Sequence, residues 1–518
     1  MFDQLPFLLI LLALPLVALV GIIAGGPAKS LALIASLGSF GIALISAIVW
    51  QQQGDSSLGA FEYQVLSKPE ITLALGLPDA MSVILVLLTT IVTLAAIMAS
   101  RCPEGRERLW FSSILLISVG ALGAFLSTDL FFFYAFHELA LIPTFLMIGM
   151  LGKGDRKEAA WKITLYLAFG SIVLLAGLLW LVGASGSSSL LFSELLASPI
   201  DPAAQKGIAA LLLIGFGTLV SLFPFHSWAA PAYASAPTPI AMLHAGVLKK
   251  FGLYGLFRLY PMVSEGLKPW LTLLIILLLA NILWVGFVTL NQKRLDGMLA
   301  NSSVMHMGYI FLAFAALIAA ESTIANPLAL PAATLLMFGH GISIALLFAL
   351  SDQIEGKTGT LTMANLGGLG KSTPALCFLF GLAGMASIGL PGLANFAGEA
   401  AVFLSGFKNW TYTEPLGPVQ IATIIAIFGV VISAIYMLRA IRQIFQGSPV
   451  SITENVADLT LKEKAPALLL SLALLAVGIY PNLLLQLFQR QTVQPSPVLV
   501  ESASPATSET ALLINESR

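Results

Sequence analysis

Charged side chains are scarce in this sequence. Of its 518 residues, 10% are Asp, Glu, Lys or Arg, whereas 58% are hydrophobic. A soluble domain carries roughly a quarter charged residues, so this chain cannot present a hydrated surface on every side. Apolar runs of about 20 residues, long enough to cross a bilayer, recur from one end to the other. The composition therefore excludes a soluble enzyme and predicts a polytopic protein of the lipid bilayer.

Other features that the sequence lacks narrow the function. The net charge of −1 excludes a basic protein that binds nucleic acid. Two cysteines, Cys102 and Cys377, provide neither a disulfide framework nor a cluster of metal ligands. The sequence has no Gly-rich phosphate loop, no CxxC pair and no flavin, iron–sulfur or quinone motif. We therefore expect this chain to hold no cofactor and no metal of its own.

Hydropathy in windows of about 19 residues predicts an all-α fold with fourteen membrane spans. The N-terminus lacks the positive region of a signal peptide and is expected to remain as the first span. The predicted spans are 5–24, 30–50, 79–100, 110–127, 129–151, 161–184, 207–235, 239–260, 268–290, 297–320, 327–350, 373–406, 418–443 and 465–486. The polar connection 51–78 predicts a small hairpin outside the bilayer. The tail from Gln489, rich in Ser, Thr, Pro and Glu, predicts an exposed, loosely ordered arm.

Basic residues are unevenly distributed between the two sides of this arrangement. An even number of spans places both termini on one side, and sixteen of the 25 Lys and Arg residues fall in the loops of the other side. These sixteen are Lys29, Arg101, Arg106, Arg108, Lys153, Arg156, Lys157, Lys162, Lys293, Arg294, Lys357, Lys371, Arg439, Arg442, Lys462 and Lys464. By the positive-inside rule, this basic side faces the cytoplasm or its equivalent. Both termini are therefore expected on the lumenal or periplasmic side.

Two of the predicted spans are long and interrupted in the same way. Span seven is broken at Phe223-Pro224-Phe225-His226, and span twelve is broken at Gly389-Leu390-Pro391-Gly392. Such breaks free backbone groups that lipid cannot satisfy, so they persist only inside protein or beside water. Two broken spans about five spans apart point to inverted repeats with an ion path at their interface. Two independent proline kinks are the simpler alternative.

Four charged side chains lie well inside apolar spans: Glu138, Lys249, Lys250 and Glu399. Each costs roughly 2.5–3.5 kcal/mol at the centre of a span, so each is expected to face the interior of the bundle. An ordinary salt bridge explains any one of them. Four charges of both signs together favour a charge relay.

All five histidines also lie in or beside apolar spans: His137, His226, His244, His306 and His340. Imidazole exchanges protons near neutral pH, so buried histidines are suited to passing them on. A single one is more simply a structural core residue. A metal site is not favoured, because no two histidines lie three or four residues apart on one helix. We predict a file of proton-exchanging groups at mid-membrane that runs across several helices.

These residues lie in motifs that resemble those of the antiporter-like, proton-translocating subunits of respiratory complex I. The resemblance is to the type called NuoM in bacteria and NdhD in cyanobacteria and chloroplasts, and it covers all but the chain ends and 51–78. The motifs are His137-Glu138-Leu139, Phe223-Pro224-Phe225-His226-Ser227-Trp228, Ala245-Gly246-Val247-Leu248-Lys249-Lys250, His306-Met307-Gly308, Gly339-His340-Gly341, Gly389-Leu390-Pro391-Gly392, Asn395-Phe396 and Gly398-Glu399.

The resemblance implies a division of the chain into four parts. Residues 1–109 would hold spans one to three, 110–260 the first five-helix repeat, 261–445 the second, inverted repeat, and 446–518 the last span and the tail. Each repeat would contain one broken helix.

The resemblance also implies roles for individual residues. Glu138 matches the glutamate of span five, Lys250 the lysine of span eight and Glu399 the terminal glutamate of span twelve. His306 and His340 match residues that link them along a central polar axis. The remaining buried groups, Lys249, His137, His226 and His244, are candidates for the same relay.

On this reading, the chain translocates protons while other subunits reduce quinone with their iron–sulfur clusters and flavin. Its partners would be other membrane subunits, including a second antiporter-like subunit, in a thylakoid or bacterial inner membrane. Two alternatives stay open. One is a subunit of a multi-component cation/proton antiporter, and the other is a scaffold with a degenerate pump path.

Two positions depart from the family pattern. The family has a lysine in span seven, five residues before the proline of the break, that pairs with the glutamate of span five; this sequence has Leu219 there. Before span ten, Asp296-Gly297 replaces a basic pair. The missing lysine suggests a specialised NdhD paralogue, similar to subunits of carbon dioxide uptake complexes.

The missing lysine leaves two explanations for the charge of Glu138. We expect Lys249 to lean toward span seven and to replace the absent cation. Otherwise Glu138 would be protonated at rest, stabilised by His137 or by water near Thr218 and Ser221.

Overall fold

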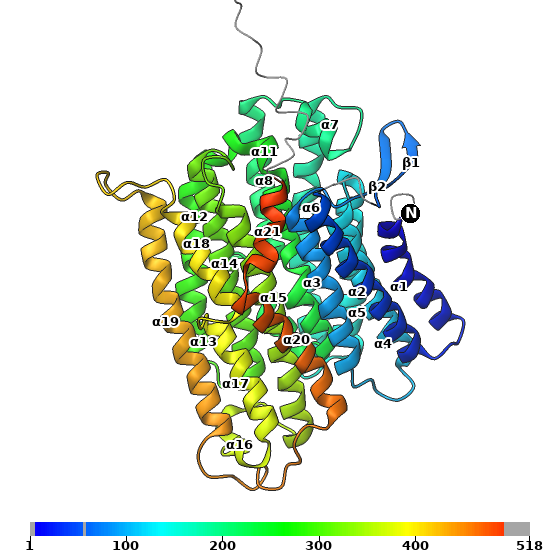
Figure 1. Ribbon diagram of the computed structural model, residues 1–518, viewed down its shortest axis with the longest axis vertical. Coiled ribbons are helices and arrows are strands. Elements are labelled where there is room, and N and C mark those ends of the chain that lie inside the picture. The colour runs from blue at the N-terminus through cyan, green and yellow to red at the C-terminus, as the bar shows by residue number, and fades with distance from the viewer. Residues whose placement is uncertain (1–5, 55–58, 492–518) are drawn as a thin grey trace, which may run out of the picture.

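The computed structural model describes residues 6–54 and 59–491, and almost all of them lie in a bundle of long helices (Figure 1). Nine predicted spans are single helices: α1 (Phe7–Ile23), α2 (Ala28–Gln53), α3 (Ala80–Ala99), α4 (Glu107–Leu126), α5 (Leu130–Leu151), α6 (Arg156–Ser185), α14 (Leu295–Ala320), α15 (Ala329–Thr358) and α19 (Pro418–Phe445). Short helices α7 (Phe192–Ala197) and α16 (Leu369–Ser372) lie in connections.

The other five predicted spans consist of more than one segment. Span seven is α8 (Pro202–Val220) and α9 (Ala229–Ser235), span twelve is α17 (Pro374–Ile388) and α18 (Ala394–Gly406), and span fourteen is α20 (Leu461–Ile479) and α21 (Asn482–Gln491). Span eight is α10 (Thr238–Leu243), a π-helical turn (His244–Leu248) and α11 (Lys250–Leu267). Span nine is α12 (Leu271–Ala280), a π-helical turn (Asn281–Val285) and α13 (Gly286–Leu290).

Every predicted span thus coincides with helix, although not every helix is long enough to cross a membrane alone. Ten of the described helical runs are long and apolar enough, or eleven when α20 and α21, bent by 63°, are counted as one. The run Thr238–Leu290 counts once in that total but contains predicted spans eight and nine. Helices α1 and α17 are shorter. The fold is therefore the polytopic, all-α membrane fold that the sequence predicts.

The predicted hairpin in 51–78 is present, outside the bundle. Strands β1 (Phe61–Ser67) and β2 (Glu70–Leu75) pair antiparallel, with Phe61 opposite Leu75. Isolated bridges join β2 to the ends of the neighbouring helices, at Leu75–Ser127 and Glu70–Ser189. The hairpin therefore covers one end of α4 and α5. Helix α2 ends at Gln53, so residues 51–53 of the predicted connection are helical.

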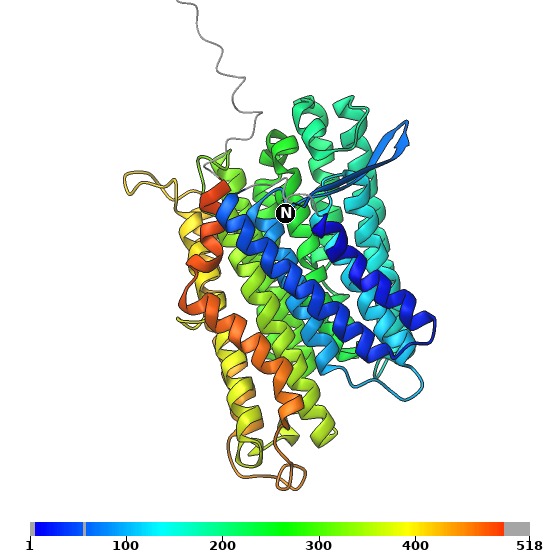
Figure 2. The same cartoon turned by 45° about the vertical axis from the view of Figure 1, so that its right-hand side comes forward.

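The two ends of the described chain lie at the same end of the bundle as the hairpin (Figures 1 and 2). The loops and helix ends that hold the sixteen basic residues lie at the other end, which we call the basic end. Helix α21 continues to Gln491, so the prediction of a loose arm from Gln489 is wrong for the first three residues. The rest of the predicted arm, 492–518, lies outside the described residues.

Helices α14 and α15 form the centre of the bundle. All of the most apolar 18-residue stretch of α15 is buried, as is 89% of that of α14 and of α3, compared with 33% in α2 and 39% in α6. A fully enclosed helix can keep polar side chains away from lipid. The central position of α14 and α15 is what shelters His306 and His340.

Of the predicted boundaries between the four parts of the chain, the one at residue 260 falls inside α11. The division of the chain into these parts stays a prediction.

Candidate functional site

The break in span seven is stabilised by one amide side chain from span nine. Helix α8 ends at Val220, and Ser221 takes a left-handed conformation with φ of 66°. Asn281 Oδ1 accepts the Phe223 N–H at 2.5 Å, and Asn281 Nδ2 donates to the carbonyls of Ser221 and Val304, both at 3.1 Å. The bonds to Phe223 and Ser221 satisfy backbone groups that the break would leave unpaired inside the membrane, and the bond to Val304 joins Asn281 to α14. Sequence reasoning missed Asn281, although a lone Asn within an apolar span was the available signal.

The break in span twelve is formed differently, around Glu399. Gly389 ends α17 with φ of 82°, and a Cβ atom there would collide with the Glu399 carboxylate. The carbonyl of Ser387, in the last turn of α17, faces His306 Nε2 at 2.9 Å. The glycine thus allows the backbone to approach Glu399 closely, and the break brings a carbonyl to the central histidine.

A file of polar side chains crosses the centre of the bundle from span eight to span twelve. Lys249 Nζ lies 3.5 Å from Ser303 Oγ, and Ser303 Oγ lies 3.2 Å from His340 Nε2. The His340 and His306 rings stack with their centroids 5.3 Å apart and their planes 15° apart. His306 Nε2 lies 3.8 Å from Glu399 Oε1. All five side chains are buried. We call this file the polar axis.

His306 has two carbonyl partners. Its Nδ1 lies 2.8 Å from the Ser302 carbonyl, and its Nε2 lies 2.9 Å from the Ser387 carbonyl. A carbonyl oxygen only accepts, and a neutral imidazole carries a single N–H. The neutral ring therefore satisfies one carbonyl at a time, whereas the protonated ring donates to both and also faces the Glu399 carboxylate. This surrounding suits a ring that gains and loses a proton.

The two adjacent lysines point in different directions. Lys249 reaches Ser303 and lies over the Tyr233 ring, with its Nζ 5.2 Å from the ring centroid. Lys250 is fully buried and donates to the Ala245 carbonyl at 2.6 Å. The π-helical turn before them contributes one residue more than an α-turn and shifts the direction of the side chains that follow. Lys249, and not the family lysine at 250, therefore contacts Ser303 from span eight.

The prediction that Lys249 replaces the missing cation beside Glu138 is wrong. Within residues 6–54 and 59–491, Lys249 forms no ion pair with a carboxylate, and its ammonium faces α14. Glu138 Oε1 accepts from Ser171 Oγ on α6 at 2.5 Å, and the Tyr134 hydroxyl also hydrogen-bonds to this carboxyl group. His137 does not hydrogen-bond to it, so the alternative of His137 as partner is wrong. A protonated Glu138 stabilised by water near Thr218 and Ser221 stays a prediction.

Glu138 itself does not face the interior of the bundle, contrary to prediction. It is half-buried and lines a cavity of about 270 Å³ between α5 and α6, together with apolar residues such as Leu141 and Leu167. Its neighbour His137 takes the interior direction instead, because adjacent helix positions point about 100° apart. His137 stacks on Phe251 with ring centroids 3.9 Å apart, and its nitrogens hydrogen-bond to no other described residue.

The remaining two histidines lie on the span-seven side of the axis. His244 Nδ1 lies 3.1 Å from the Tyr233 hydroxyl, so it is linked to Lys249 through that ring. His226 stacks on Phe223 and lines a cavity of about 680 Å³ near the basic end, which Lys293 and Arg294 also line. The structure therefore assembles Lys249, His340, His306 and Glu399 directly, and leaves His226, His137 and Glu138 outside that file.

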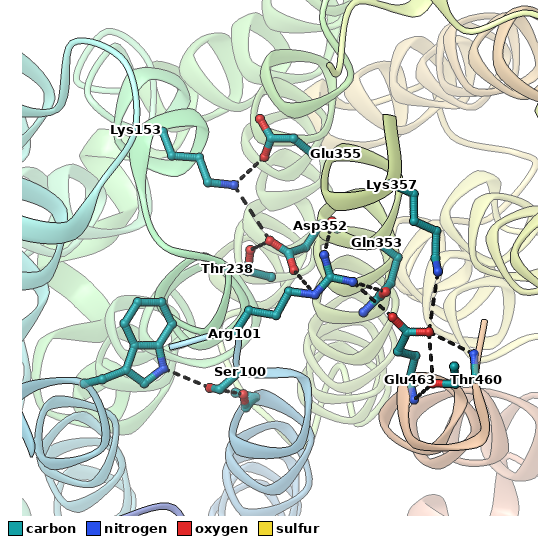
Figure 3. A network of polar contacts seen from close by, with 12 residues as sticks. Ser100, Arg101, Lys153, Thr238, Asp352, Gln353, Glu355, Lys357, Thr460 and Glu463 are labelled. Carbon is teal, nitrogen blue, oxygen red and sulfur yellow. Dashed lines mark hydrogen bonds and ion pairs between the residues drawn. The ribbon is translucent and has the colours of Figure 1, made fainter. Parts of the chain in front are cut away.

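A second polar network, at the basic end, joins five elements (Figure 3). Arg101, just after α3, pairs with Asp352 on α15 at 3.5 Å and with Glu463 on α20 at 3.3 Å. Asp352 also pairs with Lys153 at 3.7 Å and accepts from Thr238, at the start of α10, at 2.6 Å. Single surface ion pairs contribute little, but a network that shares partners holds its helix ends in one arrangement. Sequence reasoning missed this network.

The hairpin end has a buried ion pair of its own. Arg258 Nη1 on α11 lies 2.6 Å from Asp79 Oδ2, and Arg258 also donates to the Tyr254 hydroxyl at 3.1 Å. Asp79 caps α3 by accepting the Ser82 N–H. The pair therefore fixes α11, which follows the lysines, to the start of α3. In the part of the chain that the structure describes, no three His, Cys, Asp or Glu side chains come together as a metal site.

Comparisons with known proteins identify the family of the chain. Residues 127–425 match the family model described as "NADH:quinone oxidoreductase/Mrp antiporter, TM". An NAD(P)H-quinone oxidoreductase chain 4 1 from Synechococcus sp. (strain JA-3-3Ab) is 37% identical over 80% of this chain and 78% of its own length. A protein of the same name from Synechococcus sp. (strain JA-2-3B'a(2-13)) is 34% identical over 95% of this chain and 92% of its own length.

Two solved structures have the same fold. A chain of respiratory complex I from Thermus thermophilus with bound NADH superposes with a TM-score of 0.83 at 28% identity, over 94% of this chain and 100% of that one. A chain of the Mrp complex from Dietzia sp. DQ12-45-1b superposes with a TM-score of 0.79 at 22% identity, over 94% and 97% of the two chains. At that lower identity, the second similarity is one of fold alone.

Proposed function

The chain belongs to the NADH:quinone oxidoreductase/Mrp antiporter family, and we propose that it is an NdhD-type, proton-translocating subunit of a complex I-like NAD(P)H- or ferredoxin:quinone oxidoreductase. Other subunits of the assembly would carry the quinone, iron–sulfur clusters and flavin, and this chain would couple their reaction to proton movement. The observation that carries the proposal is the buried polar axis from Lys249 to Glu399. A protein that only filled the membrane would gain nothing from burying these ionisable groups.

The contacts of the axis define a route for protons. The Ser303 hydroxyl both donates and accepts, so it passes a proton between the Lys249 ammonium and His340 Nε2. His340 Nδ1 bonds to no described residue, and the stacked rings make no direct hydrogen bond, so a bridging water carries the proton on to His306. His306 then delivers it to Glu399. Lys250, bound to the Ala245 carbonyl, acts as a neighbouring charge in this scheme.

The orientation and location of the chain follow from its charge distribution and its relatives. With the basic end toward the cytoplasm or stroma, both termini face the lumen or periplasm. The relatives named above are cyanobacterial, which supports a thylakoid membrane. The Leu219 substitution supports a specialised paralogue, in a complex that serves carbon dioxide uptake, with a second antiporter-like subunit as a neighbour.

The alternative is a subunit of a multi-component cation/proton antiporter, which the fold similarity to the Mrp chain supports. The subunit list of the complex purified through a tag on this chain separates the two functions. Co-purification with quinone-reductase subunits is the expected result, whereas co-purification with small antiporter subunits alone would overturn the proposal.

Proton translocation is tested in proteoliposomes that contain the purified complex. Glu399→Gln keeps the shape of the side chain and removes its proton site, so quinone reduction is expected to continue with fewer protons moved per electron. An unchanged ratio in a fully assembled complex would favour the third possibility, a scaffold with an inherited polar axis.

A further inference from the structure

The proton route through the polar axis does not use the cavity that His226 lines near the basic end. This cavity of about 680 Å³ lies at the break of span seven, between α9, α13 and the start of α14. Residues 291–294 form a polar rim, and the apolar side chains of Ala230, Pro231 and Val288 form the wall that lies deeper in the bundle. The cavity therefore has a polar mouth and an apolar interior.

The rim is held in place and is positively charged. Arg294 contacts Asp296 with two nitrogens, Nε to Oδ1 at 3.1 Å and Nη2 to Oδ2 at 2.7 Å, so the charges of these two side chains cancel. The Lys293 carbonyl accepts the Met363 N–H at 3.1 Å, which fixes the backbone of the rim. The Lys293 side chain is exposed and forms no hydrogen bond or ion pair with another described residue. Its ammonium therefore remains free at the mouth.

Helix α6 contributes a second lysine from the other side. The Tyr166 hydroxyl on α6 accepts from Ser227 Oγ at 2.9 Å, and Ser227 lines the cavity. Lys162 lies one turn before Tyr166 on the same side of α6, and its charge acts on the His226 ring. Within residues 6–54 and 59–491, Lys162 also forms no hydrogen bond or ion pair. Two lysines without a carboxylate partner thus flank one cavity.

The surface below these lysines is apolar. Trp284, one turn deeper than Val288 in span nine, is 61% exposed. Phe169, about 10 Å deeper along α6 than Lys162, is 47% exposed, and its ring lies 6.0 Å from that of Phe225 in the break. A cationic mouth above exposed aromatic rings matches the two parts of a phospholipid, an anionic headgroup and an acyl chain.

We infer that this cavity binds the headgroup of an anionic phospholipid. Lys293 at the rim and Lys162 on α6 would hold the phosphate, and an acyl chain would lie over the exposed rings of Phe169 and Trp284. Basic pockets between membrane helices take anionic headgroups in this way, because the lysine charge attracts the phosphate while the apolar walls hold the lipid in register.

The charges and walls of the cavity select this occupant over others. A free phosphate, or water alone, would leave the apolar wall at Ala230, Pro231 and Val288 hydrated, which is unfavourable. A zwitterionic lipid brings a cation of its own, and the carboxylate of the cavity, Asp296, is already bound by Arg294. An anionic lipid covers the wall and meets both lysines without needing a carboxylate.

Photo-crosslinking in nanodiscs identifies the occupant. The purified complex is placed in equal amounts of phosphatidylglycerol and phosphatidylcholine, with a photoreactive amino acid in place of Asn291 at the rim. Each lysine near an anionic headgroup is worth about a fivefold preference, so phosphatidylglycerol is expected to be enriched more than about tenfold. A control replaces Phe428, which is 63% exposed in the middle of α19, where both lipids are expected in proportion to their supply.

Three results at Asn291 would overturn the inference: equal crosslinking of both lipids, no lipid crosslink, or a crosslink to the polypeptide of a neighbouring subunit. Inorganic phosphate separates a lipid from a free anion. An excess of it is expected to displace no more phosphatidylglycerol than sodium chloride of the same ionic strength. Specific displacement by phosphate would assign the cavity to a free anion and would also overturn the inference.

Charge removal then tests the two lysines. Lys293→Gln and Lys162→Gln are each expected to lower the phosphatidylglycerol enrichment about fivefold, whereas replacement by Arg keeps it. Lys371→Gln is the matched control, because Lys371 is an exposed lysine of the basic end on α16, outside the cavity. Subunit recovery confirms that each variant assembles. Enrichment that survives the loss of both lysines, or that falls as much in the control, would contradict the inference.

The two proposals fail independently. A purified complex without quinone-reductase subunits contradicts the proposed function, whatever binds in the cavity. A complex that contains those subunits and translocates protons, but shows no preference for phosphatidylglycerol at Asn291, contradicts only the lipid site.

Discussion

Glu138 and Glu399 are mid-span carboxylates of the first and the second half of the molecule, but they lie on different spans of those halves and their surroundings differ. Glu399 is 4% exposed, follows a break in its span and lies 3.8 Å from the imidazole of His306. Glu138 is half-buried, lies on an unbroken helix and accepts a hydrogen bond from Ser171 beside an apolar groove. The second half therefore encloses its carboxylate within the polar axis. The first half leaves its carboxylate at the edge of the bundle, in the groove between α5 and α6.

The ends of the broken spans show a related difference in direction. Helix α8 begins at the hairpin end, where Asp201 accepts the Ala203 N–H at 2.9 Å. Helix α17 begins at the basic end, where Asp458 accepts the N–H groups of Ala375 and Leu376 at 2.8 and 3.2 Å. Helices α8 and α17 thus each start at a carboxylate, and the two starts lie at opposite ends of the bundle. This is the inversion that two oppositely oriented repeats require.

The largest expected effect comes from neutralising the enclosed carboxylate. Glu399→Gln is expected to abolish most proton translocation while assembly stays normal, because no other carboxylate contacts the axis among the described residues. Glu138→Gln is expected to reduce proton translocation less, because Glu138 lies outside the polar axis. Proton-to-electron ratios in proteoliposomes and subunit recovery measure the two effects, and Glu414→Gln in the exposed loop before α19 is the control. Identical behaviour of the two variants would remove the distinction between the halves.

Breaking the axis at Ser303 is expected to have the next largest effect. Ser303→Ala removes the hydroxyl between Lys249 and His340, and proton transfer through a positioned group is typically worth about 10²–10⁴-fold in rate. We expect at least about a tenfold fall in coupled turnover. Ser351→Ala on the same helix as His340 is a matched control, because its hydroxyl donates to the Leu347 carbonyl within that helix. Normal turnover of Ser303→Ala would mean that water bypasses this hydroxyl.

Replacing the asparagine near each break is expected to lower the stability of the protein by different amounts. Asn281→Leu leaves the Phe223 N–H and the Ser221 carbonyl without their side-chain partner, at about 1–3 kcal/mol for each buried group. Asn395, near the second break, makes one side-chain bond among the described residues, to Ser343 at 3.2 Å, so Asn395→Leu is expected to cost less. Thermal unfolding midpoints in detergent measure both. A larger loss for Asn395→Leu would contradict this account of the breaks.

The smallest expected effect is on the pH dependence of folding stability, through Asp458 at the start of α17. Burial alone would raise the pKa of Asp458, but the N–H groups of Ala375, Leu459 and Leu376 and the charge of Lys464 hold that pKa below its usual range. A lowered pKa in the folded state stabilises the fold above the unfolded value of about 3.9, and this contribution is lost as the pH falls through the folded value. Asp458→Asn should therefore reduce the acid sensitivity of thermal unfolding. Equal acid sensitivity in both proteins would contradict it.

Much of the fold follows from local properties of the chain. Hydropathy identifies the spans, proline and glycine identify both breaks, and the polar connection predicts the hairpin. Each of these depends on residues close in sequence: a run of apolar side chains requires burial or lipid, and a proline interrupts backbone bonding wherever it lies. The scarcity of charge also identifies the few ionisable groups worth examining. Among them, His306, His340 and Glu399 do come together, as the resemblance implies.

The directions of side chains are where sequence reasoning fails. Lys249 was expected beside Glu138, but it contacts Ser303, because a π-helical turn precedes it. Glu138 was expected inside the bundle, but the packing of α5 turns His137 inward and Glu138 toward α6. A shift of one position rotates a helical side chain by about 100°, and hydropathy does not resolve such a shift in a span that is apolar on every face.

The sequence by itself determined that this chain crosses the membrane many times, breaks two spans and buries ionisable groups of both signs. Composition and periodicity are sufficient for that, because the cost of exposing charge or free backbone to lipid is local. Only the tertiary structure decided which of those groups meet. Ser303 links Lys249 to His340, and Asn281 satisfies a break 58 residues before it. These contacts depend on how α14, α15 and the π-helical turns pack, and packing is a property of the whole bundle.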